Sequence, residues 1–158
     1  MPINLLIICH MHPSRKLPRH GIFLTRQAEL LSRIGIHCTF VVPRAWAPWP
    51  VYRIGNPANY LSSDNPLLDD LAITAPYFRL PGWWFKRFDR FFMERAILRA
   101  TMRPHQIQKF DAILAAPVIP DAAAAIRLKK ALSVPLITLA IGSDVMVMPS
   151  YPQLKEEI

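Results

Sequence analysis

The sequence predicts an α/β fold, a Rossmann-like parallel sheet with helices on both faces. The first observation behind this prediction is an alternation of short apolar runs, typical of strands buried on both faces, with stretches of helical spacing. The second is size, since 158 residues suit one domain and a hydrophobic content of 52% excludes a disordered chain. The third is punctuation: 16 prolines against five glycines indicate firm stops between elements.

Strands and helices are expected to alternate along the whole chain. The strands are expected at residues 3–9, 38–42, 72–80, 111–116 and 135–141. The helices are expected at residues 22–34, 84–102 and 121–132. Gly35 ends the first helix, Pro43 closes the second strand, and the longest helix ends before Pro104. Residues 43–70, with several prolines, are interpreted as an irregular excursion rather than a linker between two domains.

Several classes of protein are excluded by the sequence. No run of about 18 or more apolar residues occurs, so no transmembrane helix is expected. The N-terminus has no basic leader and too short an apolar run for a secretory signal, and we therefore expect a cytoplasmic protein. Cys9 and Cys38 are too few for a disulfide framework or a four-ligand zinc site, and both are expected to be buried and reduced.

Three loops follow strands at the edge of the sheet where α/β folds bind ligands. They are residues 10–21, 117–121 and 142–144. In the first loop Gly21 opens a helix, where backbone N–H groups and the helix dipole favour an anion. Arg15 adds positive charge, and His10 and His12 can bind sugar hydroxyls or act as acid or base. The alternatives are a glycine that only eases a turn, solvated charges and histidines satisfied within the fold.

The third loop carries Gly142, Ser143 and Asp144 directly after the fifth strand. Asp144 can accept hydrogen bonds from sugar hydroxyls, and Gly142 leaves room for a ligand to approach. Alternatively, Ser143 or Asp144 caps a following helical turn. Asp121, at the start of the Ala-rich helix, is interpreted as a helix cap rather than a catalytic acid. No metal site is predicted.

Four segments of the chain, which include all three loops, form a recognisable set. They are HMHPSRKLPRHGIF (10–23), RLPGWWFKRF (79–88), FDAILAAPVIPDAAAAIRLKKALSVPLIT (110–138) and IGSDVMVMP (141–149). In order and spacing they resemble the N-terminal, acceptor-side domain of family-four glycosyltransferases of the GT-B fold. The resemblance implies transfer of a sugar, of the hexosyltransferase type, from a nucleotide-sugar donor to an acceptor between two Rossmann-like domains. It also implies a place in cell-surface polysaccharide or glycolipid biosynthesis.

The resemblance further implies what the chain lacks. The nucleotide-sugar donor is a co-substrate that a second Rossmann-like domain would mainly bind, and no other cofactor is expected. Residues 1–158 are therefore expected to be one domain, incomplete at its C-terminal end and inactive as a transferase without the second domain. Many relatives carry a His-x-His pair where this chain has Leu114 and Ala116, and a His where it has Ile141. These aliphatic side chains cannot exchange protons.

Most of the net charge of +8 lies in residues 79–110, which contribute six of the eight charges. Aromatic and basic residues meet there in Trp83, Trp84, Phe85, Lys86, Arg87 and Arg90. At about 100° per residue one helix face is shared by Trp84, Phe85, Phe88, Phe91 and Phe92. That pattern favours an interfacial helix on an anionic membrane surface, here the inner face of the cytoplasmic membrane. The alternatives are a core helix with snorkelling arginines and a nucleic-acid surface, for which no recognised motif is present.

Two functional hypotheses follow from the sequence. The first is the acceptor-binding half of a glycosyltransferase that acts on a sugar or lipid-linked acceptor. The second is a catalytically inactive, basic peripheral-membrane or interaction module that keeps the fold without the chemistry.

Overall fold

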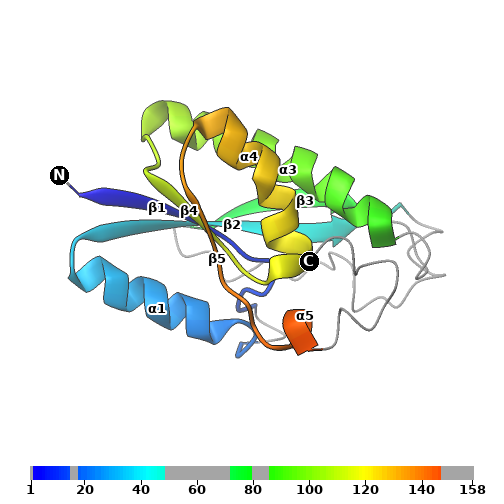
Figure 1. Ribbon diagram of the computed structural model, residues 1–158, viewed down its shortest axis with the longest axis horizontal. Helices are drawn as coiled ribbons and strands as arrows, with labels where there is room; N and C mark the ends of the chain where they lie inside the picture. Colours follow the sequence, from blue (N-terminus) through cyan, green and yellow to red (C-terminus); the bar gives the residue numbers. More distant parts are fainter. Residues whose placement is uncertain (1, 15–17, 49–71, 80–85, 147–158) are drawn as a thin grey trace.

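The computed structural model describes residues 2–14, 18–48, 72–79 and 86–146, and it contains one five-stranded sheet. All strands are parallel, in the order β3-β2-β1-β4-β5 (Figure 1). Their bounds are β1 (Ile3–Ile8), β2 (Ile36–Trp46), β3 (Ala72–Phe78), β4 (Ala112–Ala115) and β5 (Leu136–Thr138). The order is that of one Rossmann-like half with two further strands on one side. The predicted fold class is therefore confirmed.

Helices cover both faces of this sheet. They are α1 (Ile22–Arg33), α3 (Lys86–Ile107), α4 (Ala123–Leu132) and the short α5 (Ser143–Met146). A kinked turn, η3 (Val118–Ala122), joins β4 to α4. α1 lies on one face, and α3 and α4 lie side by side on the other (Figure 1).

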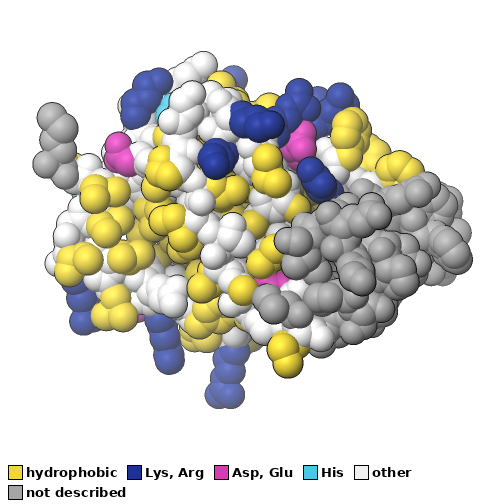
Figure 2. All heavy atoms as spheres, in the orientation of Figure 1, with side chains coloured by type: hydrophobic (Ala, Val, Ile, Leu, Met, Phe, Trp, Pro, Cys, Tyr) yellow, Lys and Arg dark blue, Asp and Glu magenta, His cyan; other side chains and the backbone are white. Residues whose placement is uncertain are grey.

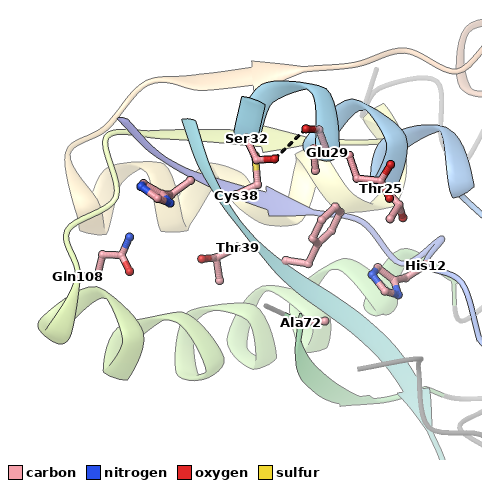
Figure 3. Close-up of a pocket in the computed structure, with 11 residues that line it drawn as sticks. His12, Thr25, Glu29, Ser32, Cys38, Thr39, Ala72 and Gln108 are labelled. Carbon is pink, nitrogen blue, oxygen red and sulfur yellow. Dashed lines mark hydrogen bonds between the residues drawn. The ribbon is translucent and has the colours of Figure 1, made fainter. Parts of the chain in front are cut away.

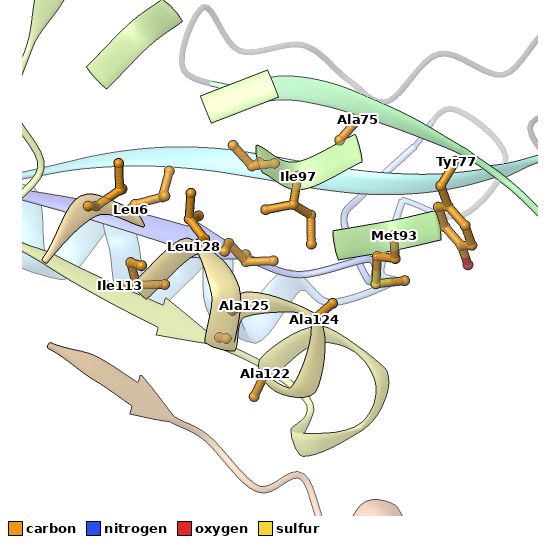
Figure 4. Close-up of a cluster of buried hydrophobic side chains, with 14 of the residues drawn as sticks. Leu6, Ala75, Tyr77, Met93, Ile97, Ile113, Ala122, Ala124, Ala125 and Leu128 are labelled. Carbon is orange, nitrogen blue, oxygen red and sulfur yellow. The ribbon is translucent and has the colours of Figure 1, made fainter. Parts of the chain in front are cut away.

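The buried residues divide between the two faces in strict alternation along β1. Leu6 and Ile8 belong to the core beneath α3 and α4 (Figure 4), whereas Leu5 and Ile7 belong to the core beneath α1. Side chains of a strand point to opposite faces in turn, so a strand covered on both sides must be apolar throughout. The uninterrupted apolar run from Leu5 to Cys9 is thus explained by two cores rather than one.

β2 extends past the proline that was expected to close it. β1 pairs with β2 only as far as Val41, whose carbonyl accepts a hydrogen bond from Cys9 N at 3.3 Å. Pro43 lies two residues after Val41, so its backbone faces the same edge of β2 as that of Val41 does. β1 has already ended at that point and offers no partner. The missing N–H of Pro43 therefore removes no ladder bond, and β3 pairs with β2 as far as Trp46. The prediction that the strand ends at Pro43 is wrong for this reason.

α3 likewise continues through Pro104, before which it was expected to end, and reaches Ile107. Because Pro104 lies in the last turns, its missing N–H affects a single helical bond. Gln108 holds the end of the helix: its N–H donates to Pro104 O at 2.8 Å, and its side-chain amide donates to Asn4 Oδ1 at 2.5 Å. Contacts with the start of β1 thus compensate for the proline.

The other boundaries differ by a few residues from those expected. β5 has three residues rather than seven, because its partner β4 has only four. The first residues of the expected excursion form the end of β2, and residues 49–71 lie outside the described residues. These differences leave the three ligand-edge loops where the sequence places them.

Candidate functional site

The closest side-chain pair at the carboxyl edge of the sheet is His10 with Asp121. His10 follows β1 and Asp121 follows β4, the strand beside it. Asp121 Oδ2 lies 2.5 Å from His10 Nδ1, and Asp121 Oδ1 accepts the backbone N–H of His10 at 2.8 Å. One carboxylate oxygen of Asp121 thus binds the backbone of His10, and the other binds its ring.

This pairing corrects the interpretation of Asp121 as a helix cap. The N-cap position of α4 is Ala122, and no side chain caps the helix there. Asp121 lies within η3 instead, and its carboxylate accepts the hydrogen bonds of His10 rather than those of the first turn. The kinked turn directs the side chain toward β1, which the spacing along the sequence does not reveal.

The surroundings of His10 favour its charged form. Burial opposes the charge, but the Asp121 carboxylate, by its charge and its hydrogen bond, outweighs burial and raises the pKa of His10 above its usual value. The guanidinium groups of Arg79 and Arg44 oppose this rise. The neighbouring His20 has its pKa lowered, by burial and then by the charges of His10 and Arg44. Of these two histidines, His10 therefore carries more positive charge near neutral pH.

One ring nitrogen of His10 is left for a ligand. The His10 side chain is 35% exposed, whereas that of Asp121 is fully buried. A carboxylate accepts and does not donate, so the neutral ring keeps its proton on Nδ1 and Nε2 is the base. A histidine oriented by a buried carboxylate is suited to taking a proton from a bound hydroxyl.

Asp144 braces the loop that carries Asp121. Its side chain is buried, and it accepts the N–H of Val118 at 2.7 Å and that of Ile141 at 2.9 Å. Val118 opens η3, so one carboxylate ties the loop after β5 to the turn that holds Asp121. Both Asp144 oxygens are engaged by backbone groups, and a sugar hydroxyl would have to share them.

Gly21 and Gly142 both have positive φ but meet different surroundings. A Cβ on Gly21 (φ 68°) would lie 2.0 Å from Met11 O, whereas one on Gly142 (φ 79°) would meet no atom within 4 Å. Gly21 therefore lets the loop after β1 pack against the start of α1. That helix start has no side-chain cap and no acidic residue in its first turn, so its positive end is not neutralised by its own residues.

His12 lies apart from the His10–Asp121 pair. Its side chain is buried, with Nδ1 3.1 Å from Pro13 O, and its ring meets Phe40 edge-on with 5.1 Å between centroids. His12 and Thr25 lie at one end of a pocket of about 230 Å³ on the α1 side of β2, and Gln108 lies at the other end (Figure 3). The two histidines of the first loop thus occupy two different places.

Some of the predicted residues cannot be placed. Arg15, Trp83, Trp84 and Phe85 lie outside the described residues, as do the side chains of Lys86, Arg87 and Ser143. Arg90 lies on α3 and is partly exposed. Among the predicted residues with described side chains, His10 and Asp121 join the loops after β1 and β4, and Asp144 joins the loops after β4 and β5.

Two features of the site were missed in the sequence analysis. His10 and Asp121 are 111 positions apart. Their signal is topological, because the first and fourth strands of a Rossmann-like sheet are neighbours and their following loops meet. Arg44 lies inside β2, and its Nη2 donates to His12 O at 3.5 Å. A charged residue within an apolar strand is the pattern that marks it.

Metal and thiol chemistry find no support in the part of the chain that the structure describes. No three His, Cys, Asp or Glu side chains there are grouped so that they could hold a metal ion. Cys9 and Cys38 are buried and form no disulfide. Burial, with a smaller effect of the Asp121 charge, raises the pKa of Cys9 far above its usual range. The Cys9 thiol is therefore not a nucleophile near neutral pH.

Comparison with known proteins shows similarity to a distant relative. No family model matches the chain. The chain is 26% identical over 156 residues to TuaC of Bacillus subtilis (strain 168), which is assigned as a teichuronic acid biosynthesis glycosyltransferase. The alignment covers 94% of this chain but 39% of TuaC, so the chain spans well under half the length of this relative. The similarity supports a glycosyltransferase relationship.

Proposed function

We propose that this chain is the acceptor-binding half of a GT-B glycosyltransferase and that His10 is its general base. The observation that carries the proposal is the His10–Asp121 pair, placed at the ligand-binding edge of a Rossmann-like sheet. The similarity to TuaC along 94% of the chain supports the reaction class. Neither observation alone would be enough, since fold does not imply function.

The proposed step moves one proton and exchanges two bonds. Nε2 of His10 takes the proton of an acceptor hydroxyl as the hydroxyl oxygen forms a bond to the anomeric carbon of the nucleotide sugar. The bond from that carbon to the phosphate oxygen breaks, and the nucleotide leaves with the electron pair. The Asp121 carboxylate keeps the ring oriented and stabilises the imidazolium that forms.

Positive groups near His10 suit the phosphates of the donor. The start of α1 presents backbone N–H groups, and no acidic residue in its first turn neutralises them. Arg44 is close enough that its charge acts to lower the pKa of both His10 and His20. The nucleotide-sugar donor is a co-substrate that a second domain would mainly bind. The residues of this chain would then meet the phosphate end of the donor from the acceptor side.

The product class and the location follow from the sequence and the relative together. TuaC is named for teichuronic acid biosynthesis. We assign the present chain to cell-surface polysaccharide or glycolipid biosynthesis, with a sugar or lipid-linked acceptor, at the inner face of the cytoplasmic membrane. Within the described ranges no helix is long and apolar enough to cross a membrane. The surface that we propose for membrane attachment is the basic side of α3.

Sugar transfer by the chain together with a separately expressed donor-binding domain tests the proposal. A panel of nucleotide sugars and acceptors is supplied, and transfer of labelled sugar is measured. We expect His10→Gln to lower transfer by roughly 100-fold or more, because a general base contributes about 10²–10⁴-fold. His37→Gln, on the exposed start of β2, is the matched control and should transfer as the parent does. Equal transfer by the His10 variant would overturn its role as base.

A second candidate is a domain that keeps the fold without catalysis. It is favoured by Leu114 and Ala116, which are aliphatic and packed in the core beneath α1 where resembling enzymes carry histidines. Absence of transfer and of donor hydrolysis with every partner domain and every nucleotide sugar would favour this candidate. Transfer that depends on His10 would exclude it.

A further inference from the structure

A groove runs between the edge strand β3 and α3, on the side of the molecule away from α1. It has a volume of about 570 Å³, and its walls include Phe78, Phe92, Arg95, Ala96, Arg99 and Ala100. Figure 2 shows Lys and Arg side chains gathered over the side of the molecule formed by α3 and α4. The groove is therefore a concavity with an apolar floor on the basic side of the fold.

Two arginines of this groove have no carboxylate partner among the residues that the structure describes. Arg95 and Arg99 lie four positions apart on α3, so that they are neighbours on one helix face. The two acidic residues of the helix pair elsewhere: Asp89 lies 3.0 Å from Arg79, and Glu94 lies 3.0 Å from Arg127. Two like charges one turn apart repel each other, and an anion between them would remove that repulsion.

Two of the residues that line the groove, Phe78 and Phe92, belong to a row of four aromatic rings. Centroid distances are 6.2 Å from Trp46 to Phe78, 5.5 Å from Phe78 to Phe92 and 5.5 Å from Phe92 to Phe91. The two ends of this row are exposed, Trp46 by 48% and Phe91 by 45%. Arg95 lies over the Phe91 ring, 4.4 Å from its centroid, which orients the guanidinium beside the row.

We propose that this groove binds the phosphate of an anionic lipid headgroup. Guanidinium groups bind phosphate through paired hydrogen bonds. Two guanidinium groups are available in this groove, because Arg95 and Arg99 both line it. Exposed aromatic rings beside basic residues are typical of a membrane–water interface, where the ring enters the acyl boundary and the charge meets the headgroup. A soluble phosphate would make no use of the exposed rings, and for this reason the groove is assigned to a lipid.

The assignment places the carboxyl edge of the sheet toward the membrane. Trp46 and Phe78 end their strands at that edge, which is also the edge that carries His10. A headgroup held in the groove would bring a lipid-linked acceptor to the same edge. The inference rests on the proposed peripheral location but not on sugar transfer, so the two are tested separately.

Vesicle sedimentation with the 158-residue chain tests the proposal. Neutral phosphatidylcholine vesicles are compared with vesicles that also contain phosphatidylglycerol, and Arg95→Gln/Arg99→Gln is compared with the matched variant Arg26→Gln/Arg33→Gln on the opposite face. We expect binding to anionic vesicles only, weakened roughly 10- to 30-fold in the groove variant and less than about threefold in the control. Phe91→Ala should also weaken binding, which a purely ionic attraction would not require.

The outcomes distinguish failure of the proposed groove from failure of the proposed peripheral location and from binding of another kind of ligand. No binding to anionic vesicles by the parent overturns the peripheral location and the groove with it. Equal loss in both double variants overturns the groove alone, because net charge then explains binding. Binding to anionic vesicles that Phe91→Ala leaves unchanged, or tighter binding of a single-stranded oligonucleotide than of anionic vesicles, overturns the lipid assignment. Unchanged melting of each variant shows that the fold is intact.

Discussion

Charged side chains are arranged in opposite ways at the carboxyl edge of the sheet and along α3. At the edge, Asp121 and Asp144 are buried and accept hydrogen bonds from groups of the fold itself. Along α3, Arg95 and Arg99 line an open groove and meet no carboxylate among the described residues. Buried charges must be satisfied within the fold, whereas exposed ones cost little and remain open to a ligand. The difference assigns positioning and proton transfer to the edge and docking to the groove.

The largest effect is expected where a buried carboxylate is removed. Asp121→Ala leaves the N–H and the ring of His10 without their acceptor and should lower the free energy of unfolding by about 2–4 kcal/mol. Glu94→Gln, which breaks the exposed pair with Arg127, should cost about 0–1 kcal/mol. Urea unfolding of both variants measures the contrast, and equal losses would contradict it.

The two loop glycines provide the next contrast at the same edge. Gly21→Ala combines a positive φ with a clash against Met11 O and should cost roughly 2–3 kcal/mol. Gly142→Ala has the positive φ without the clash and should cost about 1 kcal/mol. Thermal or urea unfolding gives both values. A Gly142 variant at least as destabilised as the Gly21 variant would show that the first loop is not held by close packing.

Asp144 is expected to act through the loop that carries Asp121. Asp144→Asn keeps only one acceptor oxygen, so one of the backbone N–H groups of Val118 and Ile141 loses its acceptor, and the variant should cost about 1–2 kcal/mol. If Asp144 positions Asp121, the variant should also lower the pKa of His10, by less than Asp121→Asn does. Loss of stability with an unaltered His10 titration would restrict Asp144 to a purely structural role.

The smallest expected effect is a difference in pH dependence. Because the pKa of His10 is raised in the folded chain, the stability from its pair with Asp121 is fully present below about 6.5 and is lost as pH rises through the higher folded value. The rate of sugar transfer should instead increase as pH rises through the pKa of His10, because a general base acts in its deprotonated form. Unfolding at several pH values, with Asp121→Asn as control, measures the first trend, and the acid limb of transfer measures the second.

The fold was predictable from the sequence because burial on both faces leaves a direct trace in composition. Every residue of β1 from Leu5 onward and every residue of β4 is apolar, and the stretch that became α4 has alanines where the helix meets the sheet. The prolines were less informative. Pro43 and Pro104 stand where the lost N–H matters little, and only the pairing of neighbouring strands and the contacts of Gln108 show this.

The site was predictable only in part because its main interaction joins residues far apart in sequence. His10 stands out by its type and place after a strand, but Asp121 has the local pattern of a helix cap. The kink of η3 gives it another partner. The groove could not be predicted from the sequence, because Arg95 and Arg99 differ from the other arginines of α3 only in their position against β3.

Titration of the His10 ring by NMR tests the central claim most directly, because the proposed base depends on its coupling to Asp121. The parent chain and Asp121→Asn are compared under the same conditions. The account predicts that the parent His10 titrates above the ordinary histidine value of about 6.5 and that Asp121→Asn lowers its pKa. A His10 that titrates at or below 6.5 in the parent, or that is unaffected by the substitution, would contradict it.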